Sequence, residues 1–299
     1  MTFDLHFFRA AHLPTVTAES VSAWAAAWPQ IRRDGQNAFQ YLNKFTGVTF
    51  KIELAGPPAG AFPDGLRHAG LRSRMEVQRP SFFGLEAAPV LEDLGQRLEL
   101  WAVESASPDP APQFLTAEWF LRAWTRAHRN AAVALSHNFP RTGLYTAREE
   151  QARAFWDYMS GYPEFSERSA KAGFFAPRMF LMARHGAADV QTAVTLIPDA
   201  AQVLPRTDLA MVVADRTRLF RIKKEVDVFY APMSEVLQLL SPWLFEFEAR
   251  PELLMLRRDD VAAAFERLAR YRYPWTRRDF TAVNPEQIVD SPSLQIGAA

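Results

Sequence analysis

The stretch SASPDPAPQ, Ser105–Gln113, is a clear break in composition along this chain of 299 residues. Its three prolines have no amide hydrogen and a fixed φ, so the run can join neither a helix nor a central strand. Such a composition is typical of a stiff, extended connector. Since a domain takes about 100–200 residues, we predict one domain over residues 1–104 and a second over residues 114–283, joined by residues 105–113. The alternative is one shared core that the stretch crosses at the surface.

The N-terminal side of the connector alternates strands and helices. The run VTFKIEL, Val48–Leu54, has apolar residues at every second position, which indicates a half-buried strand. Similar patterns predict strands at residues 3–9, 66–78 and 98–105, and apolar stripes predict helices that follow Thr17 and Ser81. Residues 39–45 are expected to add a helical turn. The order β-α-β-β-α-β is that of a ferredoxin-like unit, in which two helices pack on one face of an antiparallel sheet.

The C-terminal side also mixes helices with strands, so the predicted fold class is α+β. Helices are predicted at residues 116–135, from a capping box at Thr146–Glu149, and at residues 234–244 and 260–271. Strands are predicted at residues 174–183, 190–197, 209–214, 225–230 and 253–256, and the first two are joined by a hairpin. The polar tail, residues 284–299, is expected to be loosely held.

Charge and cysteine content exclude several classes of function. Lysine and arginine total 34, and aspartate and glutamate also total 34. A chain without net charge lacks the broad positive field that attracts phosphate backbones, so dedicated nucleic-acid binding is disfavoured. The absence of cysteine excludes disulfides, thiolate metal sites and cysteine nucleophiles. Neither a signal-peptide pattern nor an apolar run long enough to span a membrane is present, so we expect a cytoplasmic protein.

The sequence contains none of the local motifs that mark common catalytic or cofactor sites. Its six histidines have no H-x-x-x-H spacing, and there is no G-x-S-x-G, G-x-x-x-x-G-K-[ST] or G-x-G-x-x-G. We therefore predict no catalytic residues, no metal site and no cofactor. Because many active sites leave no local signature, an enzyme is kept as the alternative.

Asp208 enters the apolar run LPRTDLAMVV, where a charge is costly to bury unless it is paired. Arg206 lies two residues earlier, on the same strand face if the strand begins that early. We interpret Arg206 and Asp208 as a structural ion pair. The alternative is an acid-base site of an enzyme, in which Asp208 is the acid.

Two basic runs are candidate binding surfaces. The first has five positive residues in nine, which suits an anionic partner or, alternatively, an exposed edge strand protected from pairing. The second interleaves arginines with aromatic residues, which are frequent in protein–protein hot spots and also stack on bases. It equally fits a helix end followed by an arm that packs its rings. The candidate residues are Arg216, Arg218, Arg221, Lys223 and Lys224 in the first run and Arg272, Tyr273 and Trp275 in the second.

Four segments, MTFDLHFF, RPSFFGLEAAPVLEDLGQRLEL, APRMFLMAR and LPRTDLAMVV, resemble a loose group of uncharacterised bacterial proteins. Some of that group resemble immunity proteins of contact-dependent or type VI toxin systems. The resemblance supplies no catalytic residues and implies a cytosolic inhibitor that binds and neutralises a cognate toxin. We therefore hypothesise a binding protein whose partner is a protein toxin. The alternatives are an enzyme with a site in the C-terminal part and a nucleic-acid-associated module that uses the two basic runs.

Overall fold

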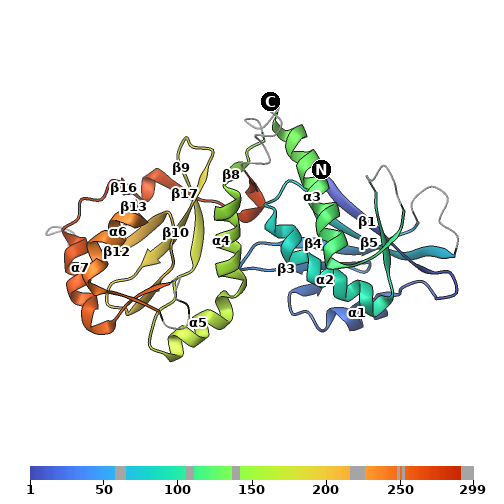
Figure 1. The fold of residues 1–299 in the computed structure, drawn as a ribbon, viewed down its shortest axis with the longest axis horizontal. Coiled ribbons are helices and arrows are strands. Elements are labelled where there is room, and N and C mark those ends of the chain that lie inside the picture. Colours follow the sequence, from blue (N-terminus) through green and yellow to red (C-terminus); the bar gives the residue numbers. More distant parts are fainter. Residues whose placement is uncertain are drawn as a thin grey trace. The chain divides into compact units, whose positions relative to one another are not determined.

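The computed structural model describes residues 1–57, 65–105, 111–136, 142–215, 226–247, 250 and 253–290 of the chain. The chain forms two compact units (Figure 1). The first comprises Met1–Leu144 together with Pro285–Ala299, and the second comprises Tyr145–Asn284. Each unit combines helices with β-strands, so the α+β class is confirmed.

The division between the units lies at Leu144–Tyr145, and not at the proline-rich stretch. Helix α3 (Ala117–Ser136), which we expected to open the second part, packs against α2 (Phe82–Leu98) of the first unit. Burial explains this, because Phe120 and Trp124 of α3 are almost fully buried and meet Phe3 edge to face, at centroid distances of 5.7 and 5.6 Å. The predicted linker therefore lies inside the first unit, and its residues 106–110 are outside the described residues.

The C-terminal segment is held more firmly than its polar composition predicted. After η5 (Pro285–Gln287), the strand β18 (Ile288–Asp290) belongs to the first unit, and its three side chains are buried. Asp290 Oδ2 accepts a hydrogen bond from the backbone N–H of Ser81, at 2.9 Å. Two apolar side chains and one bonded carboxylate thus fix a stretch that we expected to be loose. Residues 291–299 lie outside the described residues.

The first unit is built on a seven-stranded sheet with the order β2-β3-β4-β5-β1-β6-β7, and its neighbouring strands are antiparallel. Helices α2 and α3 lie in front of this sheet in Figure 1. The remaining elements are β1 (Thr2–Ala10), α1 (Ala18–Ala25), β2 (Ile31–Arg33), β3 (Ala38–Leu42), β4 (Thr49–Leu54), β5 (Leu66–Glu76), β6 (Trp101–Glu104) and β7 (Gln113–Phe114).

Alternation along the strands gives this sheet one buried and one charged face. Phe3, Leu5 and Phe7 of β1 are buried, at every second position, and Phe3 reaches the rings of α3. The opposite face carries ion pairs such as that between Arg72 Nη2 and Glu53 Oε2, at 2.6 Å. Helices α2 and α3 pack on the apolar face.

Residues 38–42 form β3, so the helical turn predicted at residues 39–45 is wrong. Phe39 and Tyr41 are both buried, and Tyr41 stacks on Phe50 of β4 at a centroid distance of 4.8 Å. The Tyr41 hydroxyl donates to Glu86 of α2 at 2.8 Å. A helix would place positions 39 and 41 on different faces, so burying both rings against one layer requires an extended strand.

The second unit contains a six-stranded sheet, β16-β13-β12-β10-β9-β17, in which β10 and β12 are parallel and the other neighbours antiparallel. A smaller sheet has the order β11-β15-β14. The strands are β8 (Tyr145–Ala147), β9 (Met179–Arg184), β10 (Val190–Leu196), β11 (Gln202–Leu204), β12 (Leu209–Asp215), β13 (Val226–Pro232), β14 (Leu244–Glu246), β15 (Leu254–Leu256), β16 (Trp275–Thr276) and β17 (Phe280–Ala282). The helices are α4 (Glu149–Ser160), α5 (Tyr162–Lys171), α6 (Met233–Leu240) and α7 (Val261–Ala269), with short 3₁₀ turns η2 (Ser241–Trp243), η3 (Arg258–Asp260) and η4 (Arg277–Asp279).

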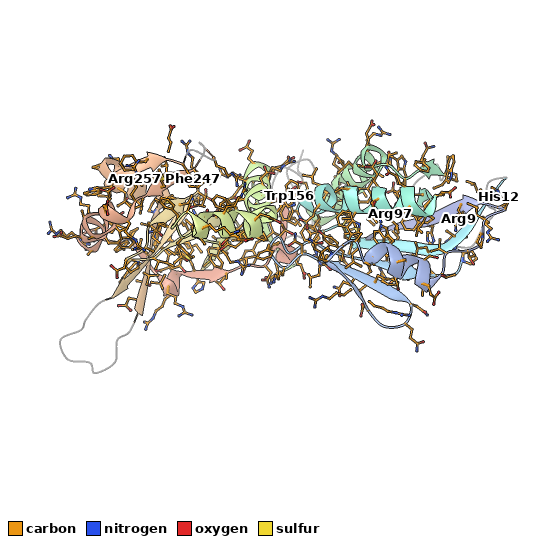
Figure 2. All side chains as sticks on the ribbon, turned by 90° about the horizontal axis from the view of Figure 1, so that it is seen from below. Arg9, His12, Arg97, Trp156, Phe247 and Arg257 are labelled. Atoms are coloured by element: carbon orange, nitrogen blue, oxygen red, sulfur yellow. The ribbon has the colours of Figure 1, made fainter. Side chains whose placement is uncertain are left out.

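Apolar contacts among the described residues hold this unit together at two places. The first is a cluster on the six-stranded sheet, made of Met182, Ala193, Leu209, Met211, Tyr230 and Phe280. The second surrounds Phe247, which is labelled in Figure 2. The Phe247 ring lies edge to face with Phe165 of α5 at 6.1 Å and with Phe174 at 6.2 Å. These rings tie α5 to the chain that follows the small sheet's strand β14.

The capping box predicted at Thr146–Glu149 is wrong. Thr146 lies in β8, where its amide donates to the carbonyl of Ala188 at 2.8 Å. Helix α4 begins after Arg148, whose side chain makes no capping hydrogen bond. Strand pairing with residues far along the chain thus outweighs the local capping pattern.

Candidate functional site

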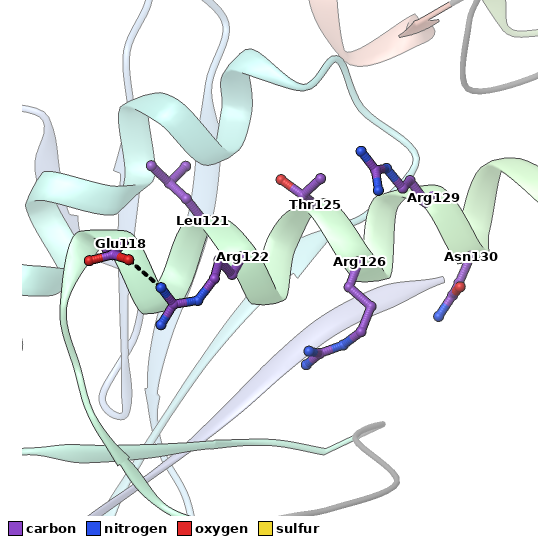
Figure 3. Close-up of a pocket in the computed structure, with 7 residues that line it drawn as sticks. All are labelled: Glu118, Leu121, Arg122, Thr125, Arg126, Arg129 and Asn130. Atoms are coloured by element: carbon purple, nitrogen blue, oxygen red, sulfur yellow. Dashed lines mark hydrogen bonds and ion pairs between the residues drawn. The ribbon is translucent and has the colours of Figure 1, made fainter.

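A groove along the outward face of α3 is the first candidate site (Figure 3). Its volume is about 490 Å³, and the described residues that line it belong to α3. Spacings of three and four residues bring them together on one side of the helix. They are Glu118, Leu121, Arg122, Thr125, Arg126, Arg129 and Asn130.

Helix α3 presents this face because its apolar residues lie on the opposite one. The buried stripe follows the period of the helix and consists of Phe120, Ala123, Trp124, Ala131, Ala132 and Leu135. His128 is also on the buried side, and its Nε2 lies 2.8 Å from the backbone carbonyl oxygen of Arg79. Packing of this stripe leaves the charged residues in solvent.

Three arginines line the groove, and in Figure 3 the side chain of Arg129 points away from those of Arg122 and Arg126. Arg122 pairs with Glu118 one turn away, and Arg126 bonds to the carboxylate of Glu104 on β6. The Glu104 side chain is only 6% exposed, so this ion pair anchors the Arg126 side chain. Among the described residues, Arg129 has no ion-pair partner. Since a guanidinium carries five N–H donors, each of the three retains donors for a bound anion.

A second hollow, of about 700 Å³, lies in the second unit between α6, η2 and α7. The Tyr271 hydroxyl in this hollow donates a hydrogen bond to Glu235. Burial, followed by that hydrogen bond and the negative charge of Glu235, raises the pKa of Tyr271 to about 12. The phenol therefore keeps its proton near neutral pH and acts as a donor there. The lining residues are Glu235, Gln238, Leu239, Pro242, Trp243, Arg267 and Tyr271.

The predicted binding residues of the second basic run do not form one surface in the structure. The ring of Tyr273 stacks on Phe229 at 5.1 Å, and its hydroxyl donates to the carbonyl of Leu268 at 2.9 Å. Trp275 packs against the core cluster, edge to face with Phe280 at 5.7 Å. Arg272 is exposed. The rings thus serve packing, and the neighbouring Tyr271 is the aromatic residue of this run that reaches a hollow.

Asp208 pairs with Arg148, and not with Arg206 as predicted. The distance from Arg148 Nη2 to Asp208 Oδ1 is 3.2 Å. The second oxygen, Oδ2, accepts from the backbone N–H and the hydroxyl of Thr192, at 2.8 and 2.7 Å, and from Gln151. Strand β12 begins only at Leu209, so Arg206 does not share a strand face with Asp208. Hydrogen-bond donors occupy both oxygens of the Asp208 carboxylate. We therefore interpret Asp208 as a structural residue that connects β10, the start of β12 and α4.

The first basic run, Arg216, Arg218, Arg221, Lys223 and Lys224, lies outside the described residues. Within the residues that are described, no three His, Asp or Glu side chains group as metal ligands. In the same ranges, no helix combines the length and apolar character needed to cross a membrane.

Comparison with known proteins gives no relative. No protein family matches this chain, and neither a curated protein nor a solved structure matches it.

The arginines of α3 were not identified as site residues from the sequence, although their spacing is visible there. Arg122, Arg126 and Arg129 are spaced by four and three residues, and the apolar stripe of the predicted helix placed them on its outer face. Charged residues on an outer face are common, so this spacing alone did not distinguish a site. What distinguishes it is the groove and the anchoring of Arg126 by Glu104.

Proposed function

We propose that this protein is a non-catalytic binding protein that presents α3 to an acidic surface of a partner protein. The observation that carries the proposal is the groove of α3, which Arg122, Arg126 and Arg129 line on the exposed side of a helix whose other side is packed in the core. Arginine is over-represented among the residues that dominate protein–protein binding. A helix whose other face is buried in the core presents these groups with little loss of backbone entropy on binding.

We further propose that the partner is a protein toxin, which this protein neutralises in the cytoplasm. The support is the resemblance of four segments to proteins that resemble immunity proteins. The basic groove would steer and orient an acidic surface of such a toxin. The alternative, an enzyme, receives less support, because hydrogen-bond donors occupy the Asp208 carboxylate.

We also propose that the first unit is an enlarged ferredoxin-like unit. Supporting this, β4, β5, β1 and β6 are neighbours in that order, with α1 following β1 and α2 following β5 in the chain. Strands β2 and β3 would then be an added hairpin at one edge, and α3 an added helix. The proposed binding surface would belong to this added helix.

The experiment is co-expression with the product of each adjacent gene, followed by size-exclusion chromatography. We expect one such product to elute together with this protein. Charge reversal by Arg129→Glu should weaken the complex by about tenfold or more, because it places like charges across the contact. The matched control is Arg32→Glu, which makes the same charge change on β2, at the opposite end of the sheet from β6.

Three results would overturn the proposal. The first is that no adjacent product forms a complex. The second is a complex that Arg32→Glu weakens as much as Arg129→Glu does. The third is salt-sensitive binding of the protein to a DNA or RNA oligomer that Arg129→Glu abolishes, which would assign the groove to a nucleic acid.

A further inference from the structure

The hollow between α6, η2 and α7 has a firm aromatic wall. The Tyr271 ring lies edge to face with Tyr273 at 5.1 Å, and its hydroxyl is held by Glu235. Tyr273 is in turn stacked on Phe229 of β13. The wall is completed by Trp243, together with Leu239 and Pro242. Contacts at both ends of the Tyr271 ring fix its orientation, so the wall exists before any ligand binds.

Opposite charges are present at the same hollow. Arg267 has no ion-pair partner among the described residues, whereas the neighbouring Arg270 pairs with Glu266 one turn away. Within the described part of the chain, Glu235 receives one side-chain hydrogen bond, from Tyr271 to its Oε2, so its Oε1 can accept another. The described lining of the hollow therefore offers a cationic donor, an anionic acceptor and an aromatic wall.

We propose that this hollow binds a small zwitterion with an aromatic body, of the class of an aromatic α-amino acid or a dipeptide containing one. The carboxylate of the ligand would pair with Arg267, its ammonium with Glu235, and its ring would lie against Trp243 and Tyr271. Charge-assisted hydrogen bonds supply the selectivity, and the rings supply apolar contact area. The volume of about 700 Å³ is in the range of sites for small ligands. This site is separate from the α3 groove and does not depend on the proposed partner.

The test follows the indole N–H signals of the ¹⁵N-labelled full chain while L-phenylalanine or glycyl-L-phenylalanine is added. Trp243→Phe identifies the signal of Trp243. We expect that signal to shift and saturate with at least one of the two probes. Phenethylamine lacks the carboxylate and 3-phenylpropionate lacks the ammonium, so each should bind about tenfold more weakly, through loss of one charge-assisted interaction.

Two variants assign the charged contacts. In Arg267→Gln, the zwitterion should no longer bind more tightly than phenethylamine. In Glu235→Gln, the zwitterion should no longer bind more tightly than 3-phenylpropionate. The matched control is Arg270→Gln, which removes a paired arginine of the same helix end and should leave binding unchanged. Absence of a Trp243 shift with both zwitterions, equal binding of all probes, or equal loss in Arg267→Gln and Arg270→Gln would overturn the proposal. Arg129→Glu on α3 should leave this binding intact, so a failure here is distinct from a failure of the partner proposal.

Discussion

A Cβ placed on Gly84 of α2 would lie 2.2 Å from Cδ1 of Trp124 in α3, far inside van der Waals contact. The Trp124 side chain is almost fully buried, and its Nε1 donates to the carbonyl of Ser81 at 3.3 Å. The indole therefore has little room to move away. Helix α3 approaches α2 this closely because residue 84 has no side chain. The contact holds α3 in the first unit with its arginine groove outward.

We expect Gly84→Ala to destabilise the first unit. Alanine would favour the helix by at most about 1 kcal/mol, whereas overpacking a core costs roughly 1–3 kcal/mol, and a contact of 2.2 Å with a buried indole places the cost at the upper end. The measurement is urea unfolding followed by tryptophan fluorescence. Gly56→Ala is the control, since nothing lies within 4 Å of a Cβ at that position. Equal midpoints for both variants would contradict the packing.

One carboxylate of α2 holds two indoles. Trp24 of α1 and Trp28 each donate their Nε1–H to Asp93 Oδ2, both at 2.9 Å, and Arg97 Nε donates to Oδ1 at 2.9 Å. Burial acts to raise the pKa of Asp93, but the donors Trp28, Arg97 and Trp24 together lower it below its ordinary value. The charged form of Asp93 is therefore the one that fixes α1 on α2.

We expect Asp93→Ala to lower the free energy of unfolding by about 1–3 kcal/mol, because two indole donors lose their acceptor. Asp93→Asn should cost less, since its amide oxygen can still accept. Glu118→Ala is the control. It removes the exposed ion pair with Arg122 one turn along α3, and its loss should cost less than about 0.5 kcal/mol. Chemical denaturation at pH 7 measures all three. A loss no larger than that of Glu118→Ala would show that the indoles find other acceptors.

Periodicity was enough to predict β1, β4, β5, α2 and α3, because each has a clear apolar face in the sequence. Periodicity could not predict that α3 belongs to the first unit. That assignment depends on the fit of Trp124 over Gly84, which is a tertiary contact between positions distant in the chain. The extended β3 was missed for a similar reason, since Phe39 and Tyr41 show a period of two only when paired with β4.

The candidate sites were less predictable than the fold. The second hollow joins Glu235 to Tyr271, which no local motif connects, and a sequence pattern cannot show which distant residues meet. The mixture of arginine and aromatic residues at Arg272, Tyr273 and Trp275 predicts a binding surface. In the structure the rings of Tyr273 and Trp275 pack against Phe229 and Phe280 instead. Aromatic residues beside arginines mark an interface only where the core leaves the rings exposed.

Acid should destabilise the first unit through His68 of β5. Its Nδ1 accepts from the backbone N–H of Gly70 at 3.1 Å, and burial, then the proximity of His6, lowers the pKa of His68 to about 4 from an ordinary 6.5. Burial also lowers the pKa of His6, helped by the Arg72 guanidinium and opposed by Asp4. Between pH 6.5 and about 4 the unfolded chain binds more protons than the folded one, so stability falls as pH falls through this range.

The measurement is the urea midpoint at pH 7.5 and at pH 5. We expect the loss between the two to shrink in His68→Gln, which keeps an acceptor for Gly70 but cannot be protonated. His12→Gln, at an exposed position, should retain the full loss. If His68→Gln and His12→Gln lose the same stability on acidification, His68 is not the group responsible.

Asp208 distinguishes a structural carboxylate from a catalytic one. It accepts hydrogen bonds from Thr192, Gln151 and Arg148, which lie on β10 and at the start of α4. We expect Asp208→Ala to cost about 2–3 kcal/mol, because partly buried donors on two elements lose their acceptor. Removal of a functional acid would instead be neutral or stabilising, since active sites are optimised for activity at the expense of stability. Urea unfolding decides between the two outcomes. The control is Asp157→Ala, because among the described residues the Asp157 side chain makes an exposed pair with Arg153 on α4.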